Sequence, residues 1–367
     1  MRRAVSIGLA AVLAIGVGYA VFRSTRHHDA GPGAGGALTV VRGVSGSEKK
    51  LFFQDPAVAA VFARHGITLE VEYAGSREIA ALPNLGQYDF VFPSGVPAAE
   101  KIRREKKIVG RTDPFSTPMA IATFRPIADL LVHNGVARPY GTGYYQFNVA
   151  KYLKLTEQDT RWSGLIGNTS YRTHKSLLVS STDVRTSNSA AQYLAIASYV
   201  ANGDNVVQMG PQAKAVLGKV APLFLRQGFT AESSDEPFND YLSLGMGKTP
   251  MVMIYEAQFL AREAAGDRAL TSDMVLMYPT PTIVTKHTVL ALTAGGNTVA
   301  TLLANDPELQ QLAVKYGFRI PDAGALRRYL AARKVPEPPT LVDVVEPPAY
   351  EVLEYLITGI DRQIQGS

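Results

Sequence analysis

The sequence contains no cysteine among its 367 residues. Disulfide bonds, thiolate metal sites, a cysteine nucleophile and lipid attachment at an N-terminal cysteine are therefore excluded. The six histidines lack the spacing of a zinc-binding helix, and no H-E-x-x-H motif occurs. Residues 43–47 miss the final glycine of a nucleophile elbow, because Ser47 stands in its place. We therefore expect no catalytic residue, no metal site and no cofactor.

Charged residues are also scarce, at 19 % of the chain, and the formal net charge is +5. Four of the positive charges, Arg2, Arg3, Arg23 and Arg26, flank an apolar N-terminal stretch, so the rest of the chain is nearly neutral. Basic residues form no stripe interleaved with aromatic residues, which argues against a nucleic acid as partner.

The apolar stretch covers residues 4–22 and would span roughly 28 Å as a helix, close to the thickness of a bilayer core. We interpret residues 1–28 as a membrane anchor, with the C-terminal domain extracytoplasmic, and residues 29–37 as a Gly/Ala linker. A cleaved signal peptide, which would give a secreted protein, is the alternative. The length of the apolar run favours the anchor, since signal peptides have shorter apolar cores.

From residue 38 onward, strand-like and helix-like segments alternate. A β-α-β-α order of this kind predicts an α/β fold with a mostly parallel sheet covered by helices. The expected strands are 38–42, 68–73, 89–92, 118–124, 176–180 and 250–255, with extended stretches at 273–278 and 281–292. The expected helices are 49–65, 77–82, 98–107, 146–155, 190–200, 213–227, 238–244, 258–265, 299–304, 307–316 and 323–333. A proline-rich segment at 335–348 precedes a closing amphipathic helix at 350–365.

Serine and glycine recur at the strand-to-helix junctions, in the loops 45–49, 75–78 and 93–95, and serine recurs with threonine and asparagine at 186–189. In a parallel sheet such loops lie at the carboxyl edge, where helix N-termini present free N–H groups and ligands bind. Helix capping alone explains serine and asparagine at these positions. Glycine beside the serine favours a ligand-binding loop over capping alone, because it allows a ligand to approach the backbone closely.

Several phrases, in this order, resemble a known family. They are VSGSEKK at 44–50, YAGSREIA at 73–80, DFVFPSG at 89–95, VSSTDVRTSNSAAQYLAIA at 179–197, TPMVMIYEAQFL at 249–260, YPTPTI at 278–283 and QLAVKYGFRI at 311–320. The chain resembles the type II periplasmic or extracellular solute-binding proteins of ABC transporters, as a divergent relative of the molybdate-, sulfate- and phosphate-binding branch.

That resemblance implies two mixed-sheet, three-layer α/β lobes joined by two hinge strands, which close on a ligand. Lobe 1 would be residues 38–117 plus 285–334, and lobe 2 residues 118–284 with the hinge strands; residues 335–367 would be a C-terminal addition. It also implies a monomer that binds a small molecule or anion and delivers it to an ABC permease.

In the oxyanion-binding members, serine hydroxyls, helix N-termini and a tyrosine hydroxyl hold the ligand, which maps here onto Ser47, Ser76, Ser187 and Tyr255. This chain departs from that pattern in three ways, which weakens the prediction of an anion as the ligand. Glu48 would repel an anion, Arg77 replaces a small residue, and Glu256 follows Tyr255. Arg77 opposite Glu48 or Glu256 suits a zwitterion, or these charges pair with each other. The full set of expected ligand-binding residues is Ser45, Ser47, Glu48, Ser76, Arg77, Ser94, Ser187, Asn188, Tyr255 and Glu256.

Three functions compete at this point. The first is capture of a small polar solute, either an oxyanion or another polar molecule, in an interlobe cleft for delivery to a permease. The second is a membrane-tethered sensor or adaptor with the same fold and no role in transport. The third, a hydrolase or transferase, lacks any nucleophile–base motif in the sequence.

Overall fold

The computed structural model describes residues 38–228, 231 and 235–366. The anchor and linker predicted for residues 1–37 lie outside these described residues. Among the helices that are described, none combines the length and the hydropathy needed to span a bilayer. The chain from Thr39 onward forms one compact unit.

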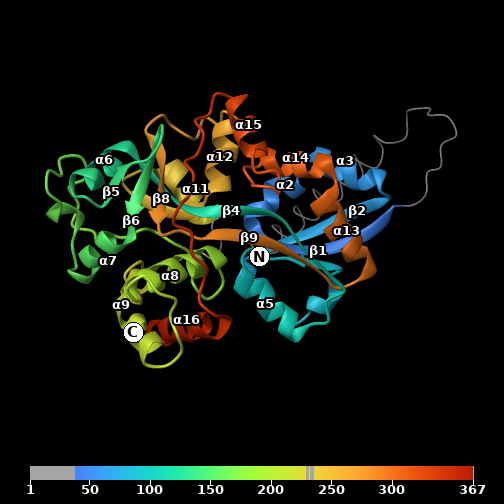
Figure 1. The fold of residues 1–367 in the computed structure, drawn as a ribbon, viewed down its shortest axis with the longest axis horizontal. Helices are drawn as coiled ribbons and strands as arrows, with labels where there is room; N and C mark the ends of the chain where they lie inside the picture. The colour runs from blue at the N-terminus through green and yellow to red at the C-terminus, as the bar shows by residue number, and fades with distance from the viewer. Residues whose placement is uncertain (1–37, 229–230, 232–234, 367) are drawn as a thin grey trace, which may run out of the picture. The chain divides into compact units, whose positions relative to one another are not determined.

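The centre of this unit is a mixed sheet (Figure 1). Its strand order is β2-β1-β3-β9-β4-β8-β6-β5, and β7 pairs with β4 beside that path. The strands are β1 Thr39–Gly46, β2 Ile67–Ala74, β3 Phe90–Phe92, β4 Gly110–Phe124, β5 Ala137–Pro139, β6 Tyr144–Asn148, β7 Met251–Tyr255, β8 Met274–Thr280 and β9 Val284–Ala291.

The long strand β4 divides the sheet into two halves. Up to Pro118 it pairs antiparallel with β9, and from Met119 it pairs antiparallel with β7 and β8. We call β1, β2, β3, β9 and the start of β4 the first half, and the end of β4 with β5–β8 the second half. The first half is parallel at β1, β2 and β3. The mostly parallel sheet expected from the sequence is thus corrected to a mixed one, because β4 joins the returning strand β9 instead of β3.

Helices cover both halves. Around the first half lie η1 Ser47–Lys49, α2 Lys50–Phe53, α3 Pro56–Arg64, α4 Ser76–Ile79, η2 Leu85–Gln87, α5 Val96–Glu105, α13 Ala294–Asn305 and α14 Pro307–Lys315. Helix α15 Ala325–Ala331 follows α14 but buries its apolar residues in the core of the second half. Around the second half lie α6 Arg125–His133, α7 Val149–Glu157, η3 Trp162–Gly164, α8 Asn188–Ala201, α9 Pro211–Val220, α10 Pro222–Leu225, α11 Asp235–Leu244 and α12 Glu256–Ala264, followed at the end of the chain by α16 Tyr350–Gln365.

Proline explains two differences from the expected helices. The predicted helix at 49–65 is interrupted because Asp55 caps a new helix by accepting a hydrogen bond from Ala57 N, with Pro56 in its first turn. The predicted helix at 213–227 is likewise divided into α9 and α10, and Pro222 begins the second of them. Proline lacks the N–H that a continuous helix needs but fits a first turn.

The expected strand at 176–180 is wrong: this segment makes only isolated bridges, from Ser176 to Arg161 and from Ser180 to Val252. The predicted helix at 146–155 begins later, because residues 146–148 end strand β6. Asn148 then caps α7 by accepting a hydrogen bond from Lys151 N.

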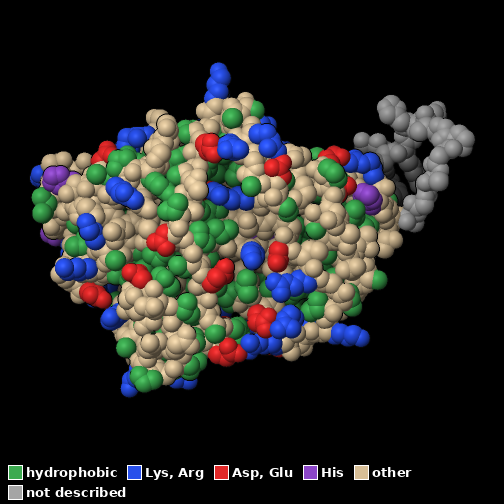
Figure 2. All heavy atoms as spheres, viewed as in Figure 1, with side chains coloured by type: hydrophobic (Ala, Val, Ile, Leu, Met, Phe, Trp, Pro, Cys, Tyr) green, Lys and Arg blue, Asp and Glu red, His purple; other side chains and the backbone are tan. Residues whose placement is uncertain are grey.

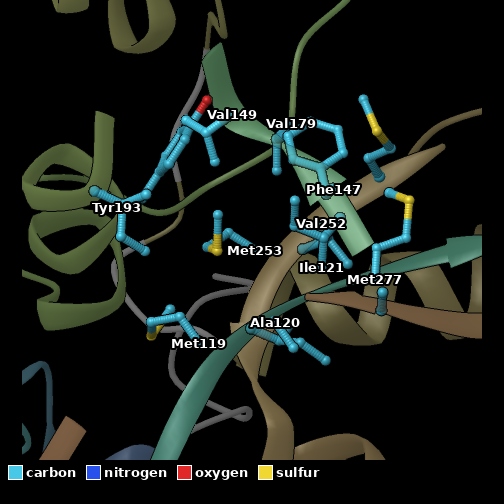
Figure 3. Packing of buried hydrophobic residues seen from close by; sticks show 14 of the residues in the cluster. Met119, Ala120, Ile121, Phe147, Val149, Val179, Tyr193, Val252, Met253 and Met277 are labelled. Carbon is cyan, nitrogen blue, oxygen red and sulfur yellow. The ribbon is translucent and has the colours of Figure 1, made fainter. Parts of the chain in front are cut away.

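Apolar residues on both faces of the sheet build the core. In β3, Phe90 and Phe92 enter one cluster, while Val91 points to the other face and enters a second cluster. This alternation is what a strand buried on both sides produces. In the second half, Met119 and Ile121 of β4 pack with residues of β7, β8 and α8 (Figure 3). Each half therefore has its own hydrophobic core.

The C-terminal segment connects the two halves. After α15, the extended chain pairs with the segment between β8 and β9, where Thr282 N donates to Asp343 O and Val345 N to Thr282 O, both at 2.9 Å. Helix α16 then contacts α8, α9 and α10 of the second half and α5 of the first (Figure 1). Its buried face consists of Val352, Leu353, Leu356, Ile357 and Ile360.

Surface charges of both signs are interspersed on the face drawn in Figure 2. Many form exposed ion pairs, such as Arg42 with Glu70 at 3.1 Å and Lys248 with Asp240 at 2.7 Å. Exposed pairs of this kind contribute only about 0–1 kcal/mol each to stability. The buried charges between the two halves therefore carry more information about function.

Candidate functional site

Two of the loops singled out in the sequence meet directly across the two halves. The backbone N–H groups of Arg77 and Glu78, at the start of α4, donate to the carbonyl of Thr186 at 3.0 and 3.1 Å. Thr186 lies just before α8, so the N-termini of α4 and α8 face each other.

A third helix N-terminus joins them through Gly95, the N-cap of α5. Gly95 has a φ of +84°, a conformation that favours glycine. A Cβ at this position would lie 2.5 Å from Asn188 Oδ1 and 2.7 Å from Gln192 Nε2. Only a residue without a side chain allows α5 and α8 to approach this closely.

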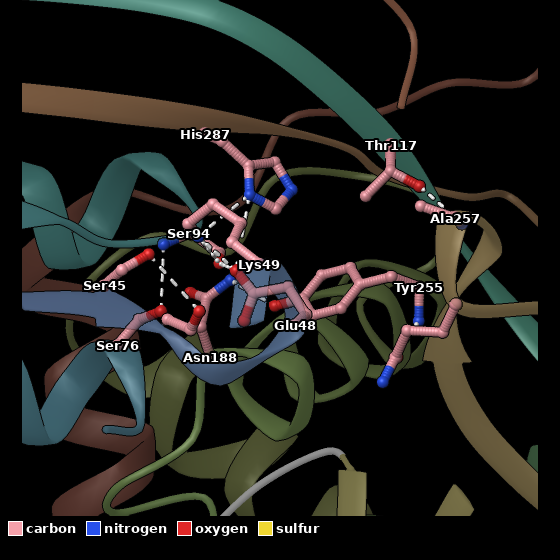
Figure 4. A network of polar contacts seen from close by, with 12 residues as sticks. Ser45, Glu48, Lys49, Ser76, Ser94, Thr117, Asn188, Tyr255, Ala257 and His287 are labelled. Atoms are coloured by element: carbon pink, nitrogen blue, oxygen red, sulfur yellow. Dashed lines mark hydrogen bonds and ion pairs between the residues drawn. The ribbon is translucent and has the colours of Figure 1, made fainter. Parts of the chain in front are cut away.

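A buried cluster of charged and polar side chains fills the space beside these helix ends (Figure 4). Lys49 is fully buried, and its Nζ lies 3.2 Å from Ser94 Oγ and 3.1 Å from His287 Nδ1. It also forms an ion pair with Glu48 Oε1, which accepts a further hydrogen bond from Ser94 Oγ. The Glu48 side chain is only 5 % exposed.

The electrostatics of this cluster keep Glu48 ionised and His287 neutral. Burial opposes ionisation of Glu48, but Lys49 and His287 outweigh it and hold the pKa of the carboxyl well below its usual range. Burial, opposed by Glu48, lowers the pKa of Lys49. Burial and the neighbouring Lys49 lower the pKa of His287 to about 4. The neutral ring of His287 places Nδ1 within 3.1 Å of Lys49 Nζ and 3.4 Å of Glu48 Oε1.

Tyr255 and Asn188 approach the same cluster from the second half. Asn188 Nδ2 donates to the Tyr255 hydroxyl at 3.1 Å, and both side chains are buried. Burial and the nearby charge of Glu48 raise the pKa of Tyr255 well above its ordinary value, so the hydroxyl stays protonated.

The predicted serines lie around this cluster. Ser76 Oγ accepts from Ser94 N at 2.9 Å, and Ser187 Oγ lies 3.1 Å from Ser189 Oγ. Ser45 is fully buried at the end of β1, with its Oγ 3.4 Å from Gly46 O. The loops that carry these serines come from both halves and converge on one region.

Arg77 and Glu256, by contrast, find partners elsewhere. Arg77 forms a bidentate ion pair with Glu354 of α16, at 2.6 and 3.0 Å. Glu256 is fully buried and binds Arg319 at 2.7 and 2.9 Å, and it accepts a hydrogen bond from the Tyr278 hydroxyl at 2.7 Å. Neither contacts Glu48, so the opposition of charges expected from the sequence does not occur within the described residues.

A cavity of about 310 Å³ adjoins the cluster, with Glu48 in its wall. Its size lies at the lower end of the range of small-molecule sites. It is lined from the first half by Ser47, Glu48, Lys50, Leu51, Gln54 and Tyr316, and from the second by Asp235, Phe238, Asn239, Ala257, Gln258, Ala261 and Arg262. Burial and the charge of Glu48 raise the pKa of Asp235 to about 6.

The comparisons with known proteins can be set beside this geometry. No protein-family model matches the sequence, and no curated protein matches it. Solved structures do match. A periplasmic thiamin binding protein has a TM-score of 0.57 at 12 % identity, covering 92 % of this chain and 99 % of that one. The sulfate-binding protein SubI from Mycobacterium tuberculosis H37Rv has a TM-score of 0.52 at 15 % identity, covering 89 % and 99 %.

A solute-binding protein of an ABC transporter from Thermotoga lettingae TMO, bound with α-D-tagatose, matches with a TM-score of 0.54 at 12 % identity, covering 89 % of this chain and 95 % of that one. This chain has the type II periplasmic solute-binding protein fold. The resemblance expected from the sequence is thereby confirmed, and the fold is a mixed α/β one with a large mixed sheet. The predicted lobe boundaries remain a prediction.

Four residues of the candidate site were not predicted from the sequence, namely His287, Gln192, Lys49 and Asp235. His287 shares the inward face of β9 with Val289 and Ala291, and Gln192 shares a helix face with Asn188, so periodicity could have marked both. Lys49 stands beside another lysine, and no pattern shows which of the two is buried. Asp235 carries no local signal.

Proposed function

We propose that this chain is an extracytoplasmic solute-binding protein that captures a small polar solute between two lobes and delivers it to an ABC-type permease. The observation that carries the proposal is the convergence of α4, α5 and α8 on one buried polar cluster, with residues supplied by both halves of the sheet. Fold alone does not fix function, so the proposal rests on this site.

Two crossings between the halves suit a hinge. One is β4, where Thr117 Oγ1 accepts a hydrogen bond from Ala257 N at 3.1 Å; the other is the connection from β8 to β9. Rotation about these two strands would separate α4 and α5 from α8 and open the cluster to water. The lobes would be residues 38–117 with 285–334, and residues 118–284. Hinge closure around a ligand is a common switching motion of binding proteins.

The location of the protein belongs to the same proposal. Residues 1–28 would hold it at the cell membrane as a single-pass monomer, with the binding lobes on the extracytoplasmic side, or would be cleaved to release it. A tethered sensor or adaptor of the same fold is the second candidate, and the length of the apolar run at 4–22 favours it slightly.

Ligand-dependent stabilisation tests the proposal. The purified full-length chain would be screened by thermal shift and calorimetry against sugars, oxyanions, amino acids and amines, because a ligand of the native state raises its stability. We expect one chemical class to raise the melting temperature. If none of the classes does so, solute capture is wrong. Once a ligand is known, co-purification with a permease would distinguish a transport role from a sensor role.

A further inference from the structure

The last helix of the chain contacts the two halves of the sheet in chemically different ways. Toward the second half it is apolar. Its buried side chains all belong to the core of that half; they are Val352, Leu353, Leu356, Ile357 and Ile360. A Cβ at Gly359 would collide with Leu217 of α9, so the backbone also packs closely there. Because removal of apolar surface from water holds this contact, α16 is a fixed part of the second half.

Toward the first half, α16 presents charge. Glu354 pairs with Arg77 of α4, and Glu351 pairs with Arg104 of α5. The guanidinium of Arg104 also lies 4.9 Å from the centre of the Tyr350 ring. Within the described residues, no side chain of α16 enters either hydrophobic cluster of the first half. This contact is therefore largely ionic, and it can break without exposing a hydrophobic core.

Arg77 is the centre of the ionic contact. Only 9 % of its side chain is exposed. Two of its nitrogens donate to Glu354 at 2.6 and 3.0 Å, Nε donates to Arg185 O at 3.2 Å, and its backbone N–H donates to Thr186 O at 3.0 Å. Each of these hydrogen bonds ends on the second half or on α16. An arginine of one half thus binds a surface of the other.

That surface is itself held together by charge. Arg185, in the loop before α8, forms an ion pair with Asp183 of the same loop and another with Asp361 of α16 at 3.2 Å. The loop and α16 are therefore joined on the second half, and Arg77 contacts both of them. All the groups involved belong to the protein, so these contacts stabilise the closed arrangement whether or not a solute is bound.

We propose that α16 is a latch, an element of the second half whose charged face holds the first half closed through Arg77 and Arg104. This inference rests on the proposed function of solute capture, since the latch controls access to the same cleft. Rotation about β4 and the β8–β9 connection opens the cleft only when both ion pairs break. An open state that only a fraction of the molecules populate weakens the apparent affinity for a solute by that fraction. The latch therefore sets how much solute is needed before the cleft fills.

The test measures the separation of the two halves without any solute. The chain has no cysteine, so two can be introduced as the only sites for spin labels. Lys107→Cys, after α5, and Lys214→Cys, in α9, are exposed positions of the first and second halves, and α16 contacts both α5 and α9 (Figure 1). Double electron–electron resonance on the purified full-length chain then gives the distribution of distances between the two labels.

Reversal of one charge should open the latch. In Arg77→Glu the new carboxylate faces Glu354, so we expect a second population at a longer distance. Exchange of the two charges, in Arg77→Glu combined with Glu354→Arg, should restore the single shorter distance. Arg42→Glu is the matched control, because Arg42 pairs with Glu70 inside the first half, and it should leave the distance unchanged.

Two outcomes overturn the latch. One is an unchanged distance in Arg77→Glu, and the other is a longer distance that the charge exchange does not reverse, since lost packing would then explain it. If Arg77→Glu does not fold, the labelled chain without that substitution decides. Raising sodium chloride from about 0.05 M to about 1 M shortens the Debye length to about 3 Å, so the longer distance should appear, and its absence refutes the proposal. A refuted latch leaves solute capture standing, and a solute screen without any hit leaves the measured distances unaffected.

Discussion

The guanidinium of Arg77 and the carboxylate of Glu354 form a bidentate ion pair between α4 and the last helix of the chain. The same guanidinium donates through Nε to the carbonyl of Arg185, in the loop before α8. Arg185 in turn reaches Asp361 of α16 at 3.2 Å. Ion pairs therefore tie helix α16 to α4 in the first half and to the loop before α8 in the second.

The Arg77–Glu354 pair should contribute measurably to stability. Arg77 is only 9 % exposed and Glu354 27 %, so Glu354→Gln should lower the free energy of unfolding by about 1–2 kcal/mol, between the values for exposed and buried pairs. Chemical denaturation measures the change. Glu337→Gln is the control, because the Arg327–Glu337 pair is long, at 3.7 Å, and both partners are about 60 % exposed. Equal effects of the two substitutions would contradict the prediction.

The apolar face of α16 should contribute more than its charges. Leu356 is fully buried, so Leu356→Ala should cost about 2–5 kcal/mol through lost burial and a residual cavity. Tyr355 is the next residue of the same helix but is 38 % exposed, so Tyr355→Ala should cost no more than about 1 kcal/mol. Urea unfolding of both variants gives the comparison. Similar losses would mean that α16 is not anchored by this face.

Gly95 should control how closely the two halves approach. A Cβ at Gly95 would collide with Asn188 and Gln192, and its φ of +84° is unfavourable for alanine. We expect Gly95→Ala to lower stability by about 1–3 kcal/mol and to increase the radius of gyration measured by small-angle scattering. Gly86→Ala, where a Cβ meets nothing within 4 Å, should change neither quantity. An unchanged radius in Gly95→Ala would refute the close contact.

Protonation of His287 should weaken the fold as the pH falls. Its pKa is about 4 in the folded chain, against about 6.5 when unfolded, so between these values the unfolded state binds the additional proton. The stabilisation that neutral His287 contributes is therefore complete above pH 6.5. The free energy of unfolding then falls by about 3 kcal/mol as the pH drops to 4. In His287→Asn this loss should be absent.

The measured quantity is the difference in free energy of unfolding between the unaltered chain and His287→Asn, taken across that pH range. Glu48 and Lys49 beside the ring, and Asp235 across the cavity, also titrate or carry charge. Because both proteins contain them, their contributions largely cancel in the difference. A difference that stays constant from pH 6.5 to 4 would show that His287 is not held neutral by its surroundings.

Local patterns predicted most elements of this fold. The closing helix at 350–365 was placed with the bounds that the structure has, since its apolar residues recur with helical spacing and prolines precede it. Patterns failed where tertiary context decides. The apolar segment at 176–180 has strand-like composition but makes only isolated bridges, and β5, Ala137–Pro139, is too short to show any period.

The candidate site shows the same division. The serine and glycine loops were found because they follow strands, and topology then brings them together. The partners of the charged residues were not found: Arg77 pairs with Glu354, 277 positions away, and Glu256 with Arg319, 63 positions away. No local pattern encodes such distant pairings, so the sequence left open whether Arg77 opposes Glu48 or Glu256.

The order of β9 and α16 in the chain has a consequence for biosynthesis. All strands of the sheet have been translated once β9 is complete, and the helix that contacts both halves is translated only afterwards. Domains of a nascent chain fold as they emerge, N-terminal parts first. The two cores can therefore begin to form before the segment that bridges them has left the ribosome.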